Sequence, residues 1–463
     1  MRKVLMSAAA PAALTIAALA FAASAAPSWA LAETVAITNA KILTAGPAGE
    51  IASGTVVIKD GKIAAVGANA QAPAGARVID AHGGVVAPGF FATGSLLGEV
   101  EVGSLGNDLS VNNPQIGASF DIQYGLNPAS VQFPVARLGG LTSAVVLPIP
   151  AGRRGGDDDD DDTVDASQYT AGPTDTGSKS HALFSGQGAV ITLGGADILT
   201  RPRVAMVAPF GAGGAAIAGG ARGAEFVALK EAFADVRDYM KNKAAYDRAG
   251  YRDLALSKGD LEALIPVVEG KMPLVAVVKR ASDIRQVLAF ARDEHVKVIL
   301  DGAQEAWMIA PEIAKAGVPV LLNPLDDRPE SYEELAATMD NAGRLAAAGV
   351  TVALEATGGS SREREMRYGA GNAVSHGMAY DAALKAITIN PAKIFGVADR
   401  TGSLEPGKDA DLVVWTGDPF EPLSQPTAVF IHGQAQPMTS RQTELRDRYK
   451  QLNGPLPPGY IHP

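Results

Sequence analysis

Charged side chains follow the ends of several predicted apolar strands, where they could act on a bound molecule. The five residues are Glu99, Glu101, Lys279, Asp301 and Glu355. Two carboxylates held close together could do acid–base chemistry, because one can donate a proton while the other accepts one. A lysine among buried acids would supply the counter-charge that they need. Two interpretations stay open: a network that pairs Lys279 with Asp301 and Glu355, or unrelated, partly solvated salt bridges.

Histidine and cysteine, the usual ligands of transition metals, are scarce in this chain. Its 463 residues include no cysteine, which excludes disulfides, thiol nucleophiles and iron–sulfur clusters. None of the histidines falls at the end of a predicted strand, and no two of them have ligand spacing, so we interpret them as surface or cap residues. They are His82, His181, His295, His376, His432 and His462.

Several other kinds of chemistry lack their motifs. The chain has no Gly-x-Ser-x-Gly turn for a serine hydrolase, no phosphate loop and no dinucleotide-binding fingerprint. A formal net charge of −10 argues against nonspecific binding of nucleic acids.

The amino terminus has the pattern of a secretory signal peptide. A basic start, Met1–Lys3, precedes an Ala/Leu-rich run to about Ala26, and small residues at Ala30 and Ala32 predict cleavage after Ala32. An uncleaved membrane anchor is the alternative. No later stretch reaches the roughly 18 apolar residues of a spanning helix. We therefore expect export to a bacterial periplasm or beyond, with no membrane attachment after cleavage.

The two ends of the chain read as β-structure. Strands are expected at 35–43 and 77–79, and Asp60-Gly61 between two β-rich runs predicts a hairpin. Further strands are expected at 411–415 and 428–432, followed by a charged helix over 441–451 and a Pro-rich tail.

The middle of the chain alternates strands and helices. Apolar runs at 274–278, 296–300, 318–322 and 350–354 are separated by segments with helical spacing. We expect one helix capped by Ser282 and another over 330–348. Strand-like runs at 141–147, 189–193 and 204–207, with a helical stripe from Phe226 to Met240, extend the pattern upstream. Such alternation implies parallel strands with crossover helices, and seven or eight units favour a closed barrel over an open sheet.

Residues 151–186 interrupt this pattern with six consecutive aspartates, Asp157 to Asp162. The EF-hand spacing fails here, because Asp162 stands where glycine is needed and Gln168 where a bidentate glutamate is needed. A solvated loop is the first interpretation of the run, and a loose cation site is the alternative.

Two segments resemble the amidohydrolase superfamily, in its imidazolonepropionase- and dihydroorotase-like branch. The front segment contains Val78-Ile79-Asp80-Ala81 and Ala87-Pro88-Gly89-Phe90-Phe91, and the back segment runs through residues 386–396 and 402–414. The resemblance covers about residues 34–440. It implies an α/β fold, a distorted (β/α)8 TIM-like barrel with a small β-sandwich formed by both chain ends. The expected domains are a signal peptide (1–32), sandwich halves (33–88 and 391–440), a barrel (89–390) and a helical and Pro-rich end (441–463).

The resemblance also implies one or two divalent metals at the carboxyl-terminal ends of the barrel strands. Such a metal lowers the pKa of bound water and provides hydroxide for attack on an amide. This sequence departs from the implied ligands, which are a His-x-His pair, later histidines and an aspartate. The corresponding positions carry Gly94, Leu96, Gly302 and Thr357.

Two functions follow from this departure. The first is a non-catalytic homologue that needs no cofactor, in which Lys279 replaces the positive charge of the metal. It would bind a small molecule at the barrel mouth or form a homo- or hetero-oligomer with an active paralogue. The second is a working hydrolase with a non-standard site, using zinc or another divalent metal or none. Its substrates would be cyclic amides, N-acyl amino acids or dipeptides.

Overall fold

A computed structural model describes residues 34–101, 108–111, 113, 115–150, 182–356 and 360–450. The expected signal peptide, the aspartate run, the Pro-rich tail and Thr357 lie outside these residues. In the described part, no helix is both long enough and apolar enough to cross a membrane.

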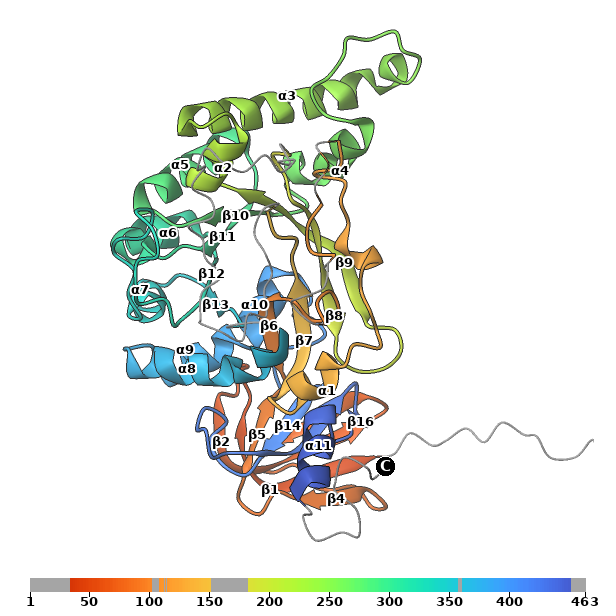
Figure 1. The fold of residues 1–463 in the computed structure, drawn as a ribbon. Helices are drawn as coiled ribbons and strands as arrows, with labels where there is room; N and C mark the ends of the chain where they lie inside the picture. The colour runs from red at the N-terminus through yellow and green to blue at the C-terminus, as the bar shows by residue number, and fades with distance from the viewer. Residues whose placement is uncertain are drawn as a thin grey trace, which may run out of the picture.

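The chain ends combine in one sheet, drawn below the barrel in Figure 1. Its order is β16-β15-β14-β5-β1-β2-β3, with β4 paired to β1. The pairing of β14 with β5 joins the two ends of the sequence, as expected for a composite domain. The strands are β1 (Val35–Leu43), β2 (Glu50–Lys59), β3 (Lys62–Gly67), β4 (Arg77–Asp80), β5 (Val85–Pro88), β14 (Leu412–Trp415), β15 (Pro426–Ile431) and β16 (Gln434–Ala435).

The predicted hairpin at Asp60-Gly61 is confirmed, since it connects β2 and β3 with positive φ at both residues. A bridge between Lys62 and Asp409, flanked by the hydrogen bond from the Ile63 amide to the Lys408 carbonyl, brings β3 back to the carboxyl-terminal segment. An apolar core fills the space within this sheet, and includes Ile37, Ile58 and Leu412.

The second sheet is a nearly closed eight-stranded barrel with helices outside it, as the resemblance implies. Its order is β13-β12-β11-β10-β9-β8-β7-β6, and a parallel bridge between Thr93 and Glu355 links the two outermost strands. The Thr93 hydroxyl donates to the Leu354 carbonyl at 2.9 Å. The strands are β6 (Phe90–Ser95), β7 (Leu141–Val146), β8 (Gly186–Thr192), β9 (Leu199–Pro209), β10 (Leu274–Val278), β11 (Val298–Gly302), β12 (Val320–Leu322) and β13 (Val352–Leu354).

One strand departs from the expected all-parallel pattern. Strand β8 is antiparallel to both β7 and β9. The connection from β8 to β9 covers only residues 193–198, and a parallel crossover needs a dozen or more residues. The upstream strands therefore form a hairpin rather than further strand–helix units.

The helices pack mainly around the later barrel strands, and α5 to α9 follow one side of the barrel in Figure 1. They are α1 (Gln132–Arg137), α2 (Ala212–Ile217), α3 (Arg222–Tyr246), α4 (Lys258–Val268), α5 (Ala281–Glu294), α6 (Ala310–Ala316), α7 (Asn341–Ala347), α8 (Met366–Ser375), α9 (Tyr380–Ala386), α10 (Ile389–Ile394) and α11 (Arg441–Lys450), with 3-10 turns η1 (Ile122–Tyr124), η3 (Ala306–Ile309) and η4 (Ser360–Glu365).

Two local helix predictions were wrong. Ser282 lies inside the first turn of α5, and the N-cap residue is Arg280. The Ala281 amide instead donates to the carboxylate of Glu305, 24 residues further along the chain. Helix α7 begins only at Asn341, because the hydroxyls of Ser331 and Thr338 accept nearby backbone N–H groups and form turns.

Aromatic stacking joins the barrel to the other sheet. The Trp415 ring of β14 lies 5.6 Å from the Phe90 ring of β6, with 26° between their planes. Both residues are fully buried. The strand that begins the barrel is thereby fixed against the strand contributed by the carboxyl-terminal segment.

Candidate functional site at the barrel mouth

The carboxyl-terminal ends of the barrel strands define the barrel mouth, and most of the candidate residues lie there. Gly94 is the second-last residue of β6, and Leu96 comes directly after this strand. Asp301 and Gly302 are the last two residues of β11. Lys279 comes directly after β10. Active sites of (β/α)8 barrels are built at this end, so the predicted strand ends converge where chemistry is expected.

A glutamate occupies the space beside Gly94. A Cβ atom on Gly94 would lie 2.7 Å from the Glu355 Oε1 atom, and Gly94 has a φ of +62°, which favours glycine. A larger side chain here would need both a strained backbone and a displaced carboxylate. The structure thus brings Gly94 and Glu355 together at the end of the first strand.

A second glutamate binds the end of the same strand. Glu363, in η4, accepts hydrogen bonds of 2.7 Å from the Ser95 hydroxyl and from the Leu96 amide. Glu363 is only 1% exposed. Its carboxylate therefore fixes the two residues that follow Gly94.

The ion pair made by Lys279 differs from the expected one. Its ammonium lies 2.9 Å from the Glu334 carboxylate, which is buried and also accepts a hydrogen bond from the Ser331 hydroxyl. One of the two open interpretations named Asp301 and Glu355 as its partners. The lysine pairs instead with an acid of the 323–340 loop, 55 residues away in sequence.

A further acid, Asp326, lies in the same loop. It accepts hydrogen bonds from the Asn323 amide at 2.7 Å and from the Gln304 amide at 2.9 Å. The pKa of Asp326 is raised to about 6, mainly by burial. The hydrogen bond from Gln304 lowers this pKa, and the charges of Glu330 and Glu334 add to the increase. Asp326 therefore titrates near neutral pH, unlike an ordinary aspartate.

Glu99 is a buried carboxyl with no hydrogen-bond partner among the described residues. It is 6% exposed, and both of its side-chain oxygens lack a donor there. Burial raises its pKa to about 8, and the charge of Asp108 adds to the shift. A carboxyl that keeps its proton at neutral pH can serve as a general acid.

Glu101 holds neighbouring segments together. Its two carboxylate oxygens accept hydrogen bonds from the Asn127 amide at 2.9 Å and from the Val131 backbone N–H at 3.2 Å. Since Val131 is the N-cap residue of α1, Glu101 stabilises the start of that helix. Of the two glutamates that follow the first barrel strand, only Glu99 has an unusual environment.

A third buried carboxyl with a raised pKa lies near the end of β9. Glu225, in α3, is 1% exposed. Burial raises its pKa to about 8, with a further contribution from Asp283. Asp283 is itself paired with Arg222, which also binds Glu333. The mouth is thus surrounded by carboxyl groups, some paired with cations and some protonated.

The side chains at the mouth do not fit the metal set that the resemblance implies. Gly94, Leu96 and Gly302 offer no imidazole, and the position of Gly302 is flanked by the Gln304 amide. Within the described ranges, three metal-ligating side chains converge at one place only, which is outside the mouth. No histidine of these ranges stands at a ligand position of the barrel: His295 and His376 are the C-cap residues of α5 and α8.

That one convergence is Asp409, Asp411 and His432, in the sheet formed by the chain ends. Asp409 already binds the side chains of Lys62 and Arg400. Asp411 accepts hydrogen bonds of 2.8 Å from the Thr401 hydroxyl and the His432 amide. Two neighbouring cations oppose a bound metal ion, so this cluster stabilises the loop between the barrel and β14.

Comparison with known proteins agrees with the fold and with the back segment. Residues 284–438 match the sequence model of the amidohydrolase family. Amidohydrolase tasK of Hapsidospora irregularis is 43% identical over 61 residues, which are 13% of this chain and 6% of that protein. The 5'-deoxyadenosine deaminase of Methanosarcina acetivorans is 50% identical over 60 residues, 13% of this chain and 14% of that protein. The matched stretches span only a small part of either relative.

A solved structure is similar over nearly its whole length. An amidohydrolase from Thermotoga maritima MSB8 superposes with a TM-score of 0.72 at 25% identity, covering 88% of this chain and 100% of that one. The fold therefore belongs to the class of amidohydrolase-type barrels with a second sheet. Together with the family match, it supports the amidohydrolase superfamily for this chain.

The residues that sequence reasoning missed come from loops rather than strands. Glu334 and Asp326 belong to the loop after β12, and Glu363 to the turn after β13. The only indication in the sequence was that these residues follow predicted barrel strands, because the loops after the strands carry the functional groups in this fold. No spacing in the sequence identifies Lys279 as the partner of Glu334, or Ser95 and Leu96 as the partners of Glu363, because these contacts join residues far apart in the chain.

Proposed function

We propose that this protein is an exported amidohydrolase-superfamily member with a degenerate metal site, which binds a small molecule or a partner without hydrolysing it. We place it in the imidazolonepropionase- and dihydroorotase-like branch on its two motifs. One observation carries the proposal: the end of the first barrel strand presents Gly94 and Leu96 and is filled by the carboxylates of Glu355 and Glu363.

Two further features support a binding role. The pair with Glu334 fixes the position of the Lys279 ammonium beside the mouth. Loss of the implied imidazoles removes the ligands that would hold zinc, because carboxylates alone suit harder ions. A barrel that keeps its fold and its mouth can still bind a molecule.

Metal content tests the proposal. The purified chain should hold far less than one equivalent of zinc, manganese, cobalt or iron after dialysis against each ion, measured by elemental analysis. The Thermotoga maritima amidohydrolase, treated in the same way, is the structural comparator. Near one equivalent of a transition metal in this chain would overturn the proposal.

Hydrolysis assays complete the test. We expect no turnover of a dipeptide, an N-acyl amino acid or a hydantoin above the background reaction. Export is tested separately by expressing the full chain in a Gram-negative host and sequencing the amino terminus of the periplasmic product, which should begin at Glu33. A full-length product left in the cytoplasm would contradict the export part.

A second candidate function is hydrolysis of a C–N bond other than a peptide bond, or of a dipeptide, at a non-standard site. Glu99 favours it, because its pKa of about 8 keeps a proton available at neutral pH. Water would add its oxygen to the carbonyl carbon, and the departing nitrogen would take a proton as the C–N bond breaks. Turnover that is lost in Glu99→Gln and kept in Glu101→Gln would favour this function.

A further inference from the structure

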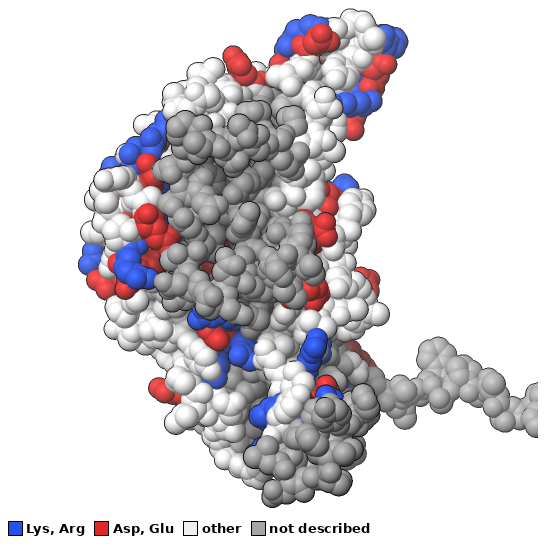
Figure 2. Space-filling view, viewed as in Figure 1, with Lys and Arg blue, Asp and Glu red and all other residues white. Residues whose placement is uncertain are grey.

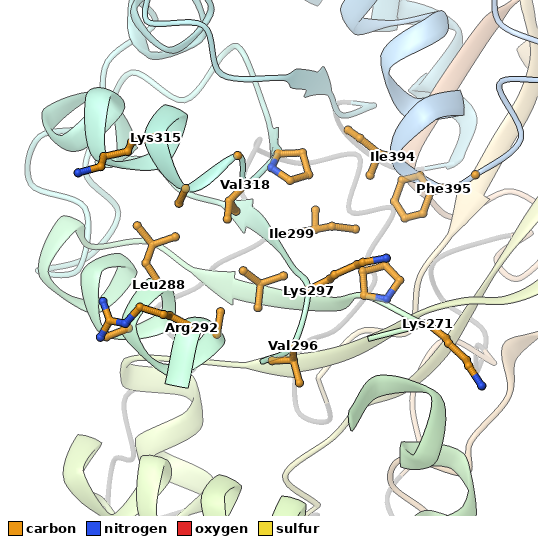
Figure 3. A pocket seen from close by; sticks show the side chains of 18 of the residues that line it. Lys271, Leu288, Arg292, Val296, Lys297, Ile299, Lys315, Val318, Ile394 and Phe395 are labelled. Atoms are coloured by element: carbon orange, nitrogen blue, oxygen red, sulfur yellow. The ribbon is translucent and has the colours of Figure 1, made fainter. Parts of the chain in front are cut away.

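A cavity of about 1020 Å³ opens at the other end of the barrel from the mouth. Pro273, Lys297 and Pro319 line it, and each stands directly before or near the beginning of a strand: β10, β11 and β12. The ends of α5, α6 and α10 complete its wall (Figure 3). We call this cavity the base cavity. Its position separates it from the strand ends where barrel chemistry takes place.

The charged side chains of the base cavity are nearly all basic. Six are cations and one is an acid, so the lining has a formal net charge of +5. They are Arg201, Lys271, Arg285, Arg292, Lys297, Lys315 and Glu312. Glu312 is bound by Arg285 at 2.7 Å. The remaining cations face the cavity or its rim without another acid among the lining residues.

Two of these cations have no acidic partner at all. Within the described residues, Lys297 and Lys315 have no carboxylate at salt-bridge distance, and both are exposed. The Arg201 guanidinium donates to the backbone carbonyl of Gly396 at 2.5 Å rather than to an acid. Arg292 and Lys271 pair only with exposed neighbours, Asp293 and Glu269. An anion would therefore meet cations whose charge is not already neutralised.

Helix ends explain only some of this charge. Arg292 and Lys315 lie in the last turns of α5 and α6, where a cation interacts favourably with the helix dipole. Arg201 also serves a helix end, because its guanidinium donates to the Phe395 and Gly396 carbonyls that follow α10. Lys271 and Lys297 lie beyond the C-caps of α4 and α5, just before strands β10 and β11. Their convergence on one cavity calls for another cause.

The floor of the base cavity is apolar. Figure 3 shows hydrocarbon side chains between the basic ones, with Val318 and Ile299 near the centre and Phe395 on the far side. Ile299 and Phe395 are each only 2% exposed, so the apolar surface that a ligand can reach comes from half-buried side chains. These are Leu288, Val318 and Ile394. An inorganic anion would interact with the rim cations alone, whereas a molecule with a hydrocarbon body also gains from covering the apolar surface.

We propose that the base cavity binds an organic anion with a hydrocarbon body, in the class of medium-chain carboxylates. The apolar body covers the partly exposed side chains of Leu288, Val318 and Ile394, and the carboxylate lies among the rim cations. The cavity is open to solvent on one side, and its volume of about 1020 Å³ is at the upper limit of small-molecule sites. This site is independent of the mouth, so it stands whether or not the mouth is catalytic.

Titration calorimetry of the full chain with octanoate tests the proposal. At low salt we expect octanoate to bind at least tenfold more tightly than octanamide, which has the same length without the charge. Inorganic phosphate should not displace octanoate at equal concentration. Equal binding of octanoate and octanamide, displacement by phosphate, or no binding of octanoate would each overturn the proposal.

Variants locate the binding. Lys297→Met and Lys315→Met remove charge and keep side-chain length, and each should weaken octanoate about fivefold while leaving octanamide unchanged. Lys241→Met, an exposed lysine on α3 away from the cavity, is the matched control and should bind octanoate as the wild type does. A double variant Lys297→Met, Lys315→Met that binds octanoate as tightly as the wild type would place the site elsewhere and overturn the proposal.

Discussion

The two ends of the barrel hold their charges in opposite ways. At the mouth the candidate side chains are mostly acids. Two of them are buried and hold polar partners: Glu363 accepts from a hydroxyl and a backbone amide, and Glu334 pairs with a lysine. At the base the notable groups are cations at the surface, and Lys297 and Lys315 have no acidic partner in the described structure. Elsewhere, as along the α5–α7 side in Figure 2, both signs are interspersed.

This difference separates structural charge from charge that is available to a ligand. A buried carboxylate that satisfies two N–H or O–H donors contributes to folding, and its removal leaves those donors unpaired. An exposed lysine without a partner contributes little to the free energy of unfolding, so replacing it should change mainly the affinity for an anionic ligand. Substitutions at the mouth should therefore change the free energy of unfolding, and substitutions at the base should change affinity.

The largest expected effect is at Glu363. Its replacement in Glu363→Ala leaves the buried Ser95 hydroxyl and the Leu96 amide without an acceptor, which should cost about 2–5 kcal/mol of unfolding free energy. Urea unfolding followed by circular dichroism measures the loss. Glu365→Ala is the control in the same turn, since Glu365 pairs only with exposed Arg362, and it should cost less than about 0.5 kcal/mol. Equal losses would remove the structural role of Glu363.

The next effect depends on pH and concerns Glu99. Its folded-state pKa of about 8 lies above the ordinary value of 4.5, so folding takes up a proton between these values. The stability of the wild type should therefore fall as the pH rises from about 4.5 to about 8. Glu99→Gln cannot ionise and should lose this dependence, which makes it more stable than the wild type at pH 9 by about 3–5 kcal/mol.

Urea unfolding at pH 5, 7 and 9 measures this difference between Glu99→Gln and the wild type. Glu101→Gln is the control, because the Glu101 carboxylate already has hydrogen-bond donors. It should follow the wild-type dependence on pH. A constant difference between Glu99→Gln and wild type at all three pH values would show that Glu99 is ionised when folded.

Sequence patterns predicted the elements well where their cause is local. The strand at 274–278 and the strand at 35–43 agree with the structure to the residue, because apolar runs bounded by polar residues specify them. The Asp60-Gly61 turn was predictable because few residue pairs adopt its backbone conformation. The direction of β8 was not, since a strand-like run of residues does not indicate which way its neighbours run.

The candidate site also combines features that the local sequence predicts with features that it does not. Pro88-Gly89 anchors the first barrel strand, so the positions of Gly94 and Leu96 could be assigned from the motif alone. The partners at those positions could not, because Glu355 and Glu363 approach Gly94 and Leu96 from more than 250 residues away. Glu334 could not be predicted as a partner of Lys279 for the same reason: it lies in a loop whose sequence resembles a helix.

A smaller effect is expected at Lys279. Lys279→Met leaves the buried Glu334 carboxylate with only the Ser331 hydroxyl, which should cost about 2 kcal/mol of unfolding free energy. Urea unfolding measures the loss, and Lys385→Met, which breaks an exposed i,i+4 pair with Asp381, is the control with a cost of about 0.3–0.5 kcal/mol. The double variant Lys279→Met, Glu334→Leu should recover part of the loss. No change in Lys279→Met would show that the pair is solvated.

The smallest effect is expected at the base, and it sharpens the comparison most. Lys297→Met and Lys315→Met break no ion pair within the described structure, so each should change the free energy of unfolding by less than about 0.5 kcal/mol. Urea unfolding without any added anion measures this change. With saturating octanoate, the wild type should gain stability and the double variant should gain less, because a ligand stabilises the state that it binds. A loss of more than about 1 kcal/mol without octanoate would mean that the base cations are structural after all, and the contrast between the two ends of the barrel would not hold.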